Sequence, residues 1–419
     1  MDTNQDPPTS GNALSVAGLF AGIGGIELGL RQAGHPITWL SDVDPVAHAV
    51  LTAQFPDAKL EGDIRGVSTL PEIDLLASGF PCQDLSQAGR TAGITGVNSG
   101  LVEHVFRLLR SSPQKPRWVL FENVPFMLRL NKGEALKSVL DSLEELGFTW
   151  AYRIMNTQAF GLPQRRRRVY ILASLTEDPR PVLLSSEGST PEQHRCQTAC
   201  GFYWTEGNTG LGWAVDAIPP LKGGSSLSIP SPPAVWMPLS HSIVTPDIRD
   251  AERLQGFPAG WTLPAVNTAG PKRQRSGNVR WRLVGNAVSV PVARWLGERL
   301  RESYPAWSES ESTPLIDGKP FPNAAWGKPG ARFVSSATDH PQVVATTHLA
   351  DFLQFPSKPL SDRALLGFWR RLSASTLRRD SNFFADLSSL AERACRSSGL
   401  TPALEQSKYS ERELVVAGS

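Results

Sequence analysis

The sequence predicts an α/β fold, with a doubly wound sheet, a smaller irregular and mostly β domain, and a helical C-terminal extension. Short apolar runs alternate with helical patterns over residues 13–175, which is typical of a doubly wound sheet. Gly, Ser and Pro are frequent over residues 185–240, and no long helical period occurs there. Helical patterns return at 248–254 and 288–301 and, after a Pro- and Ser-rich stretch at 305–345, near the C-terminus.

The elements of the main sheet follow from short apolar runs and from the helical spacing of apolar residues between them. The expected strands are Ala13–Phe20, Thr38–Ser41, Ile73–Ala77, Trp118–Phe121 and Val169–Ala173. The expected helices are Ile26–Ala33, Pro45–Gln54, Leu101–Arg110, Glu134–Leu146, Ile248–Leu254 and Val288–Arg301.

The change of composition after about Ser174 predicts the domain borders. We expect a disordered lead-in, a main domain in two segments, an irregular domain and an extension. Their ranges are 1–12, 13–180 with 248–304, 181–247 and 305–419. Within the extension, 305–345 is interpreted as a linker or loosely packed segment, Ser361–Leu372 as a basic amphipathic helix, and the region around Phe383–Arg396 as further helix.

Length and composition limit the class of protein. The 419 residues carry a net charge of +2, so any nucleic-acid surface depends on local basic clusters. No apolar stretch approaches the ~20 residues that span a bilayer, and the N-terminus lacks the basic and apolar regions of a signal peptide. The four scattered cysteines form no disulfide framework, which indicates a reducing cytoplasm.

His194, Cys196 and Cys200 are spaced as H-x-C-x3-C, which resembles part of a zinc site. Structural zinc usually has four ligands in paired spacings, and no fourth ligand is close in the sequence. We therefore interpret this segment as a loop with two ordinary thiols and expect no metal.

LFAGIGGIELGL, at Leu19–Leu30, predicts the end of a strand, a glycine turn and the start of a helix. Glycines let a backbone approach a ligand closely, and a helix N-terminus offers unpaired N–H groups. Asp42 ends the second strand, where a carboxylate can bind a ribose diol. Asp63, near the third strand, could bind an adenine amino group. Each aspartate could equally be a helix N-cap, and the turn a plain βα turn.

Two further strand ends carry residues with chemistry. Cys82, in GFPCQDLSQAG, follows the strand Ile73–Ala77 at the edge where open α/β sheets place their active sites. Glu122, in FENV, ends the next strand and could face the same cleft. Burial there would raise the pKa of Glu122 and let it protonate a substrate nitrogen. The alternative role of Glu122 is a cap or an ion pair.

QRRRRVYILA, at Gln164–Ala173, runs four arginines into an apolar strand. Alternation along the strand points Arg166 and Arg168 to one side and Arg165 and Arg167 to the other. A charge run is usually a solvated face, but we expect one pair of this run to point into the cleft. The forked guanidinium can hold a phosphate or a base carbonyl there.

Six motifs occur together in one order, namely LFAGIGG, GFPCQ, ENV, QRRRR, RLQGFP and VGNAV. Over residues 14 to about 300, the chain resembles the DNA cytosine-C5 methyltransferases, which use S-adenosylmethionine. The resemblance implies a Rossmann-like methyltransferase sheet in the main domain and a target-recognition domain at 181–247.

The resemblance also implies roles for the matching residues. Phe20 stacks on the adenine, Asp42 binds the ribose, and Asn286 closes the cofactor pocket. The expected cofactor set is Phe20, Ala21, Gly22, Ile23, Gly24, Gly25, Asp42, Val43, Asp63, Ile64, Pro81, Asn286 and Ala287. The expected catalytic residues are Cys82, Glu122, Arg166 and Arg168. The expected DNA contacts are Gln83, Ser86, Gln164, Arg165, Lys222, Gly223, Gly224 and Arg273.

In the family's reaction, the Cys82 thiolate attacks C6 of a cytosine flipped out of the duplex, and C5 then accepts the methyl group. Glu122 contacts the N3 and N4 edge, and the arginines the O2 side. A loop at Asp84–Ser99 closes over the base. The chain departs from the family twice, because Asn98 stands where many relatives have Arg, and Ala287 where many have Ser.

The resemblance implies double-stranded DNA as the partner and a monomer in a bacterial cytoplasm. Basic residues expected to hold backbone phosphates are Lys272, Arg273, Arg275, Arg280 and Arg282. Those that could extend this face or dock a partner are Arg370, Arg371, Arg378 and Arg379. The long extension is similar to that of methyltransferases in bacterial restriction or DISARM-type phage-defence clusters, whose other proteins are therefore expected partners.

Three alternatives remain. An RNA cytosine-C5 methyltransferase shares the chemistry, but the separate recognition domain and the extension speak against it. A catalytically inactive DNA-binding protein on the same fold is disfavoured by intact Cys82, Glu122, Arg166 and Arg168. A Rossmann oxidoreductase is disfavoured because the glycine turn lacks the dinucleotide-binding spacing.

Overall fold

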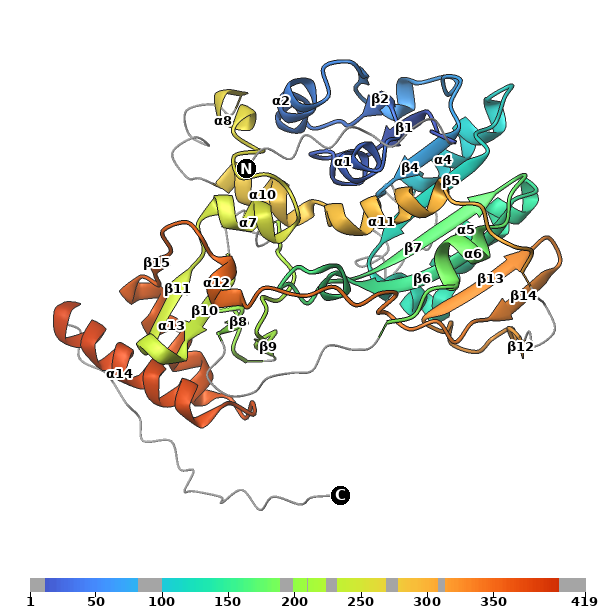
Figure 1. Cartoon of the computed structure of the whole chain (residues 1–419). Coiled ribbons are helices and arrows are strands. Elements are labelled where there is room, and N and C mark those ends of the chain that lie inside the picture. Colours follow the sequence, from blue (N-terminus) through green and yellow to red (C-terminus); the bar gives the residue numbers. More distant parts are fainter. Residues whose placement is uncertain are drawn as a thin grey trace.

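The computed structural model describes residues 12–81, 100–188, 199–208, 210–223, 232–268, 278–307 and 313–398. Within these residues it has a larger part on a ten-stranded sheet and a smaller part on a five-stranded sheet (Figure 1). The expected α/β class is confirmed. The helices of the described ranges include none that is long and apolar enough to cross a membrane.

The large sheet has the order β12-β14-β13-β6-β7-β5-β4-β1-β2-β3. Its parallel strands are β1 (Val16–Leu19), β2 (Ile37–Ser41), β3 (Lys59–Glu61), β4 (Leu75–Ser78) and β5 (Trp118–Asn123). Its antiparallel strands are β6 (Thr149–Asn156), β7 (Arg167–Ser174), β12 (Thr313–Pro314), β13 (Ala324–Lys328) and β14 (Ala331–Val334). The five expected strands are all present, with ends shifted by a few residues.

Helices cover both faces of this sheet, because alternate strand residues point to opposite sides. Leu75 and Ala77 of β4 pack in one core, and Leu76 packs in the other. The first core is closed by α1 (Gly25–Gln32), α2 (Pro45–Gln54), α6 (Pro179–Leu184) and α11 (Val290–Leu300). The second core is closed by α4 (Gly100–Ser111) and α5 (Glu134–Glu145). The carboxyl ends of the parallel strands remain open for a site.

The smaller part contains a sheet of order β15-β11-β10-β8-β9. Its strands are β8 (Cys200–Phe202), β9 (Ala214–Val215), β10 (Ala234–Met237), β11 (Ser242–Thr245) and β15 (Lys358–Pro359). Two C-terminal helices, α13 (Asp362–Ala374) and α14 (Ser381–Ser398), lie against this sheet (Figure 1). Phe202 and Trp236 of the sheet share a core with Phe368 and Phe383 of the helices.

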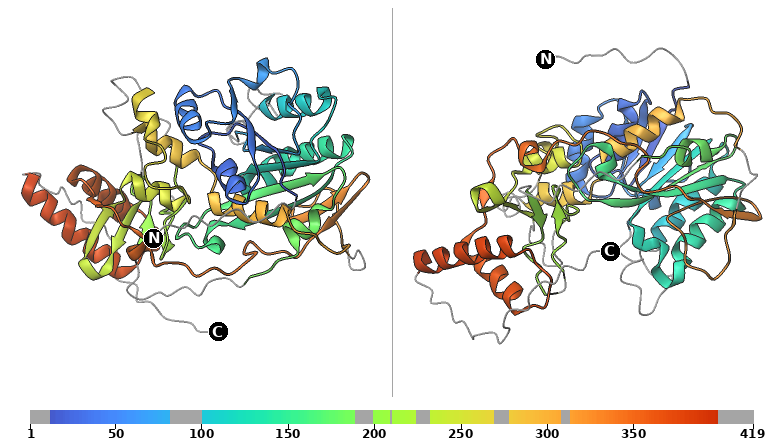
Figure 2. Two further views of the ribbon diagram at one scale, coloured as in Figure 1. Left: turned by 45° about the horizontal axis from the view of Figure 1, so that its top comes forward. Right: turned by 60° about the horizontal axis from the view of Figure 1, so that its bottom comes forward.

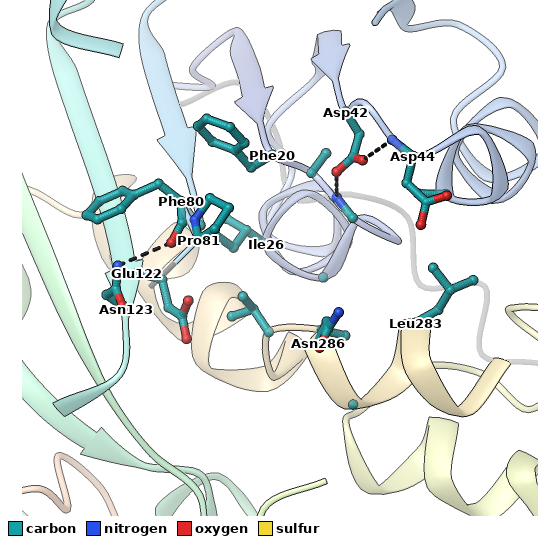
Figure 3. Close-up of a pocket in the computed structure, with 18 of the residues that line it drawn as sticks. Phe20, Ile26, Asp42, Asp44, Phe80, Pro81, Glu122, Asn123, Leu283 and Asn286 are labelled. Carbon is teal, nitrogen blue, oxygen red and sulfur yellow. Dashed lines mark hydrogen bonds between the residues drawn. The ribbon is translucent and has the colours of Figure 1, made fainter. Parts of the chain in front are cut away.

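Residues between the two parts form the remaining helices. These are α7 (Ile248–Leu254), α8 (Pro264–Thr268), α10 (Asn278–Asn286) and α12 (Leu349–Phe352). The short 3-10 segments are η1 (Ile64–Gly66), η2 (Pro125–Leu128), η3 (Leu130–Gly133), η4 (Thr157–Phe160) and η5 (Pro238–Ser240). Helix α10 lies across from the carboxyl ends of the parallel strands of the large sheet (Figure 3).

The prediction of a loose linker over 305–345 was wrong where this segment forms strands, at Thr313–Pro314, Ala324–Lys328 and Ala331–Val334. β13 pairs with β6 and extends the large sheet, and β12 and β14 continue it. The chain then crosses to the smaller part, where β15 pairs with β11 (Figure 2). The sequence signal is weak because these strands are short, and because β13 forms its hydrogen bonds to β6, a strand more than 160 residues earlier in the chain. The extension is therefore built into both parts.

Candidate active site

The open strand ends surround a cavity of about 520 Å³ between the sheet and α10. Figure 3 shows Phe20, Asp42 and Pro81 on the sheet side and Leu283 and Asn286 across from them on α10. A volume of this size is within the usual range for pockets that hold small molecules or cofactors. Residues expected in the cofactor set that line the cavity are Phe20, Ala21, Gly22, Gly25, Asp42, Val43, Pro81, Asn286 and Ala287.

The glycine turn after β1 lies at the floor of this cavity. Gly22 and Gly24 have positive φ angles of 58° and 79°, which glycine adopts without steric cost. A Cβ on Gly25 would lie 2.5 Å from the carbonyl oxygen of Val288, so this position also needs glycine. The turn therefore exposes backbone to the cavity. Ile23 and Gly24, which we expected to contact the cofactor, are not among the lining residues that the structure describes.

Asp42 lies at the end of β2, half-buried in the cavity wall. Its carboxylate accepts hydrogen bonds of 2.8 Å from the backbone N–H groups of Gly22 and Asp44. Burial raises the pKa of Asp42, and these two hydrogen bonds oppose that shift. The helix-cap role falls on Asp44 instead, whose side chain accepts from Val46 at the start of α2. Asp42 is thus held in place for a ligand.

Asp63 has the alternative role that the sequence left open. It caps η1 by accepting from the backbone N–H of Arg65 at 2.9 Å, and it also forms an ion pair with the Arg65 side chain. Neither Asp63 nor Ile64 is among the described residues that line the cavity. The side chain of Ile64 is instead buried in a core. Their contact with an adenine stays a prediction.

Pro81 is the last described residue before a gap, and Cys82 follows it directly in the sequence. Phe80, the residue before Pro81, is held in position by Asn123, whose amide donates a 3.2 Å hydrogen bond to the carbonyl oxygen of Phe80 (Figure 3). Predicted residues that lie outside the described ranges are Cys82, Gln83, Ser86, Asn98, Gly224, Lys272, Arg273, Arg275, His194 and Cys196. Cys200 lies buried in β8.

Glu122 lies at the carboxyl end of β5 and is 7% exposed. Its Oε1 is 3.1 Å from Nε of Arg168 but receives no hydrogen bond in the structure. Burial raises the pKa of Glu122, and the charges of Arg168 and Arg166 partly offset the shift. The geometry leaves a carboxyl that can hold a proton at the edge of the cavity and donate it to a ligand.

The alternation expected along the arginine run is present. Arg166 and Arg168 line the cavity, whereas Arg167 points away and forms a 2.7 Å ion pair with Asp339. Arg166 is 2% exposed and donates a 2.7 Å hydrogen bond to the carbonyl oxygen of Ala287. Burial lowers the pKa of Arg166 to about 9. Arg166 therefore links the start of β7 to the end of α10, whereas Arg168 lies beside Glu122.

Two residues that we expected to contact DNA, Gln164 and Lys222, have partners within the chain. Gln164 is fully buried, and its amide donates to the carbonyl oxygen of Leu254 at 2.7 Å and to Oε1 of Gln255 at 3.1 Å. The side chain of Gln164 is therefore buried and connects the two parts of the chain in this structure, and its DNA contact stays a prediction. Lys222 forms an ion pair with Glu206 and lies 3.7 Å from the Tyr203 ring centre.

Arg165 and Gly223 are the other two expected DNA contacts that the structure describes. Arg165 is exposed, and its guanidinium approaches the carbonyl oxygen of Gly212 at 3.4 Å. Gly223 packs so closely on α10 that a Cβ would lie 2.2 Å from Oδ1 of Asn286. Arg280 is mostly buried and is paired with Glu252 at 2.7 Å, whereas Arg282 is paired with Asp44 at 2.6 Å and keeps 38% of its side chain exposed.

Three charged lining residues were not expected at the cavity from the sequence, namely Glu27, Asp44 and Arg282. Glu27 of α1 is 1% exposed and lines the cavity, but in the sequence it is one polar residue of an amphipathic helix. Arg282 lines the cavity mouth through its ion pair with Asp44. Gln255, in the motif RLQGFP, also has a structural role that its motif could have indicated. Its amide donates to the carbonyl oxygens of Val284 and Ala287.

Comparisons with known proteins agree with this architecture. A family model described as C-5 cytosine-specific DNA methylase matches residues 14–200. The Type II methyltransferase M2.BsuMI of Bacillus subtilis (strain 168) is 49% identical over 374 residues, covering 87% of this chain and 94% of that protein. The Type II methyltransferase M.BanI of Aneurinibacillus aneurinilyticus is 37% identical over 177 residues, or 41% of each chain.

Among solved structures, the S. pombe Dnmt2 methyltransferase matches with a TM-score of 0.51 and 20% identity, over 69% of this chain and 98% of that one. At this identity the match supports the fold alone. The sequence match to M2.BsuMI extends over nearly the whole length of both proteins. The chain therefore belongs to the C-5 cytosine-specific DNA methylase family and is a DNA cytosine methyltransferase.

Proposed function

We propose that this methyltransferase modifies C5 of cytosine within a short specific sequence of double-stranded DNA, with Cys82 as a covalent nucleophile. The observation that carries the proposal is the Glu122 carboxyl at the end of β5. It is buried, its Oε1 accepts no hydrogen bond in the structure, and Arg168 lies 3.1 Å away. Pro81, the residue before Cys82, lines the same cavity.

The cavity fits S-adenosylmethionine in size and in donor set. Asp42 has lone pairs left on both carboxylate oxygens, which suits a ribose diol. Phe20 offers a ring for the adenine, and Asn286 faces the turn from α10 (Figure 3). When bound, this cofactor supplies an electrophilic methyl group on a sulfonium. The chain's own residues must then make the cytosine ring nucleophilic.

Covalent attack provides that activation. A bond from Sγ of Cys82 to C6 breaks the C5=C6 double bond and leaves C5 enamine-like, so that C5 can take a methyl group. The Glu122 carboxyl gives its proton to N3 and offsets the charge that develops there, while Arg168 hydrogen-bonds O2. A water molecule then takes the C5 proton, the Cys82 thiolate departs with the electron pair of the C6–S bond, and N3 returns its proton to Glu122, which restores the aromatic ring and leaves 5-methylcytosine.

The target base has to leave the duplex for this chemistry. C6 of a stacked cytosine is out of reach of a side chain, and extrusion of the base requires a few kcal/mol. We infer that the cytosine enters the cavity from the side of β5, between Glu122 and Pro81, which both line it. Recognition of the flanking bases is assigned to the smaller part, which lies beyond α10 from the large sheet (Figure 1).

The similarity to two Type II methyltransferases supports a role in restriction and modification. In this role the enzyme marks host DNA as self, and a nuclease or other defence proteins act on unmarked DNA. We expect the enzyme to work as a monomer in the bacterial cytoplasm.

Bisulfite sequencing tests the proposal. An unmethylated bacterial host expresses the wild-type chain, and a second culture expresses Cys82→Ala. Protected cytosines in one short motif, present only with the wild type, are the expected result and also give the target site. Equal protection in both cultures would refute the covalent mechanism. No protection, with a folded and cofactor-binding wild type, would favour the RNA substrate or the inactive DNA-binding protein.

A further inference from the structure

Glu27 is a buried acid at the cavity that the proposed reaction does not use. It lies in the first turn of α1 and is 1% exposed. Its Oε1 lies against the backbone of Gly18, where a Cβ would come within 2.2 Å. Its Oε2 is buried and has no hydrogen-bond partner in the structure. A leucine or methionine would fill this space at lower cost, since an unpaired buried polar group is unfavourable.

The surroundings of Glu27 favour a cationic ligand. Burial raises the pKa of Glu27 to about 8, and the nearby negative charge of Asp42 adds to the shift. Among the described residues, Asp42, directly after β2, is the charged group whose field bears on this carboxyl, and Gly18 on β1 contributes only backbone. A cation that approached the carboxyl would favour its ionised form and gain a charge-assisted hydrogen bond.

The glycine turn beside Glu27 has few acceptors left for such a cation. The carbonyl oxygen of Ala21 accepts from the N–H of Gly24, and that of Gly24 accepts from Leu28, both at 2.8 Å. The carbonyl oxygen of Ile23 accepts from the indole of Trp261 at 2.8 Å. The turn and the start of α1 therefore suit the carboxylate of an amino acid, but an ammonium group requires an additional acceptor.

We propose that Glu27 is the acceptor for the α-ammonium group of the amino-acid half of S-adenosylmethionine. This assignment rests on the proposed use of that cofactor and deepens it. It gives the unpartnered Oε2 a hydrogen-bond donor, and it distinguishes the role of Glu27 from that of Asp42, which faces the ribose. Glu27 is thus a binding residue for the half of the cofactor that adenine recognition does not reach.

A double-mutant cycle between protein and ligand tests the assignment. The ligands are S-adenosylhomocysteine and its deamino analogue, in which hydrogen replaces the amino group, and calorimetry measures both affinities. The protein variants are Glu27→Gln and, as a matched control, Glu72→Gln on an exposed loop. We expect the wild type and E72Q to prefer the amino form by about tenfold to a hundredfold. In E27Q this ratio falls close to one.

The outcomes separate the two proposals. A ratio in E27Q equal to that of the wild type overturns the assignment, as does a wild type that binds both ligands equally. A wild type that binds neither ligand contradicts the proposed function instead. Binding of 5′-methylthioadenosine, which lacks the amino-acid half, shows whether the pocket of each variant is folded. If E27Q is not folded, Glu27→Asp replaces it, because a carboxyl withdrawn by one methylene should also lower the ratio.

Discussion

Nε of Arg168 lies 3.1 Å from Oε1 of Glu122, and the two residues come from neighbouring antiparallel strands, β7 and β5. The pairing of Asn123 with Val169 places them at the same end of the sheet. The contact is an ion pair that leaves Oε1 without a hydrogen bond. Burial raises the pKa of Glu122 while Arg168 opposes the shift, so this pair sets the range of pH in which Glu122 keeps a proton.

Glu122→Gln should slow methyl transfer by about 10²- to 10⁴-fold, because glutamine can donate a hydrogen bond to N3 but cannot transfer a proton. In the wild type, the rate should fall on the alkaline side, since the active form of Glu122 is the protonated one. E122Q should lack that alkaline limb. Single-turnover rates across a pH series measure both effects. An alkaline limb that persists in E122Q would assign it to another group.

Arg168→Gln should move the same limb to higher pH. The positive charge of Arg168 lowers the pKa of Glu122, so its removal raises that pKa further. The matched control is Arg167→Gln, because Arg167 is adjacent in the sequence but pairs with Asp339 on the other side of the strand. The control should keep the wild-type profile. A limb that moves to lower pH in R168Q would contradict the pairing.

Asp42→Asn should weaken cofactor binding by about tenfold to a hundredfold, which corresponds to the loss of a hydrogen bond to a charged acceptor. The rate at saturating cofactor should change less, since Asp42 lies away from Glu122 in the cavity (Figure 3). Asp57→Asn, on an exposed turn after α2, is the control. Calorimetric titration with S-adenosylhomocysteine measures the effect. Equal affinities in D42N and D57N would remove Asp42 from the binding site.

The sequence was most informative where a signal is local. The strands that lead into the glycine turn and into the motifs GFPCQ and FENV are buried apolar runs. The expected helix Pro45–Gln54 coincides with α2, which begins after the Asp44 cap. These same elements place Asp42 and Glu122 at one edge, because the carboxyl ends of parallel strands share it. The chemistry of the site could therefore be expected from residue order.

What the sequence did not reveal depends on distant partners. β13 is stabilised by pairing with β6, and Gln164 is buried by residues of the segment that returns from the smaller part. A short apolar run or a polar side chain carries no local sign of such contacts. The same applies to Glu27, whose burial results from the glycine at position 18 in the adjacent strand.

The C-terminal helices are predicted to stabilise the smaller part. Phe383 of α14 is fully buried against Phe202 and Trp236, with ring centres 5.0 and 5.7 Å apart. Phe383→Ala should lower the free energy of unfolding by about 3–5 kcal/mol. Phe384→Ala, at a half-buried neighbour, should lower it by less. Urea unfolding measures the difference. Equal losses would indicate that α14 is not part of this core.

The stability of the enzyme should depend on pH through Glu27. The pKa of Glu27 is about 8 in the folded chain and 4.5 as its ordinary value, so the native state binds the proton more tightly. The stabilisation is complete below pH 4.5, declines by about 1.4 kcal/mol per pH unit above it, and is lost once the pH passes 8. The total is on the order of 3–5 kcal/mol. Glu27→Gln cannot titrate, so its free energy of unfolding should lack this contribution. Urea unfolding of both proteins between pH 5 and 9 gives the difference, which should shift steadily in favour of E27Q as the pH rises. A difference that is constant with pH would mean that Glu27 is already ionised in the native state and has a partner of opposite charge.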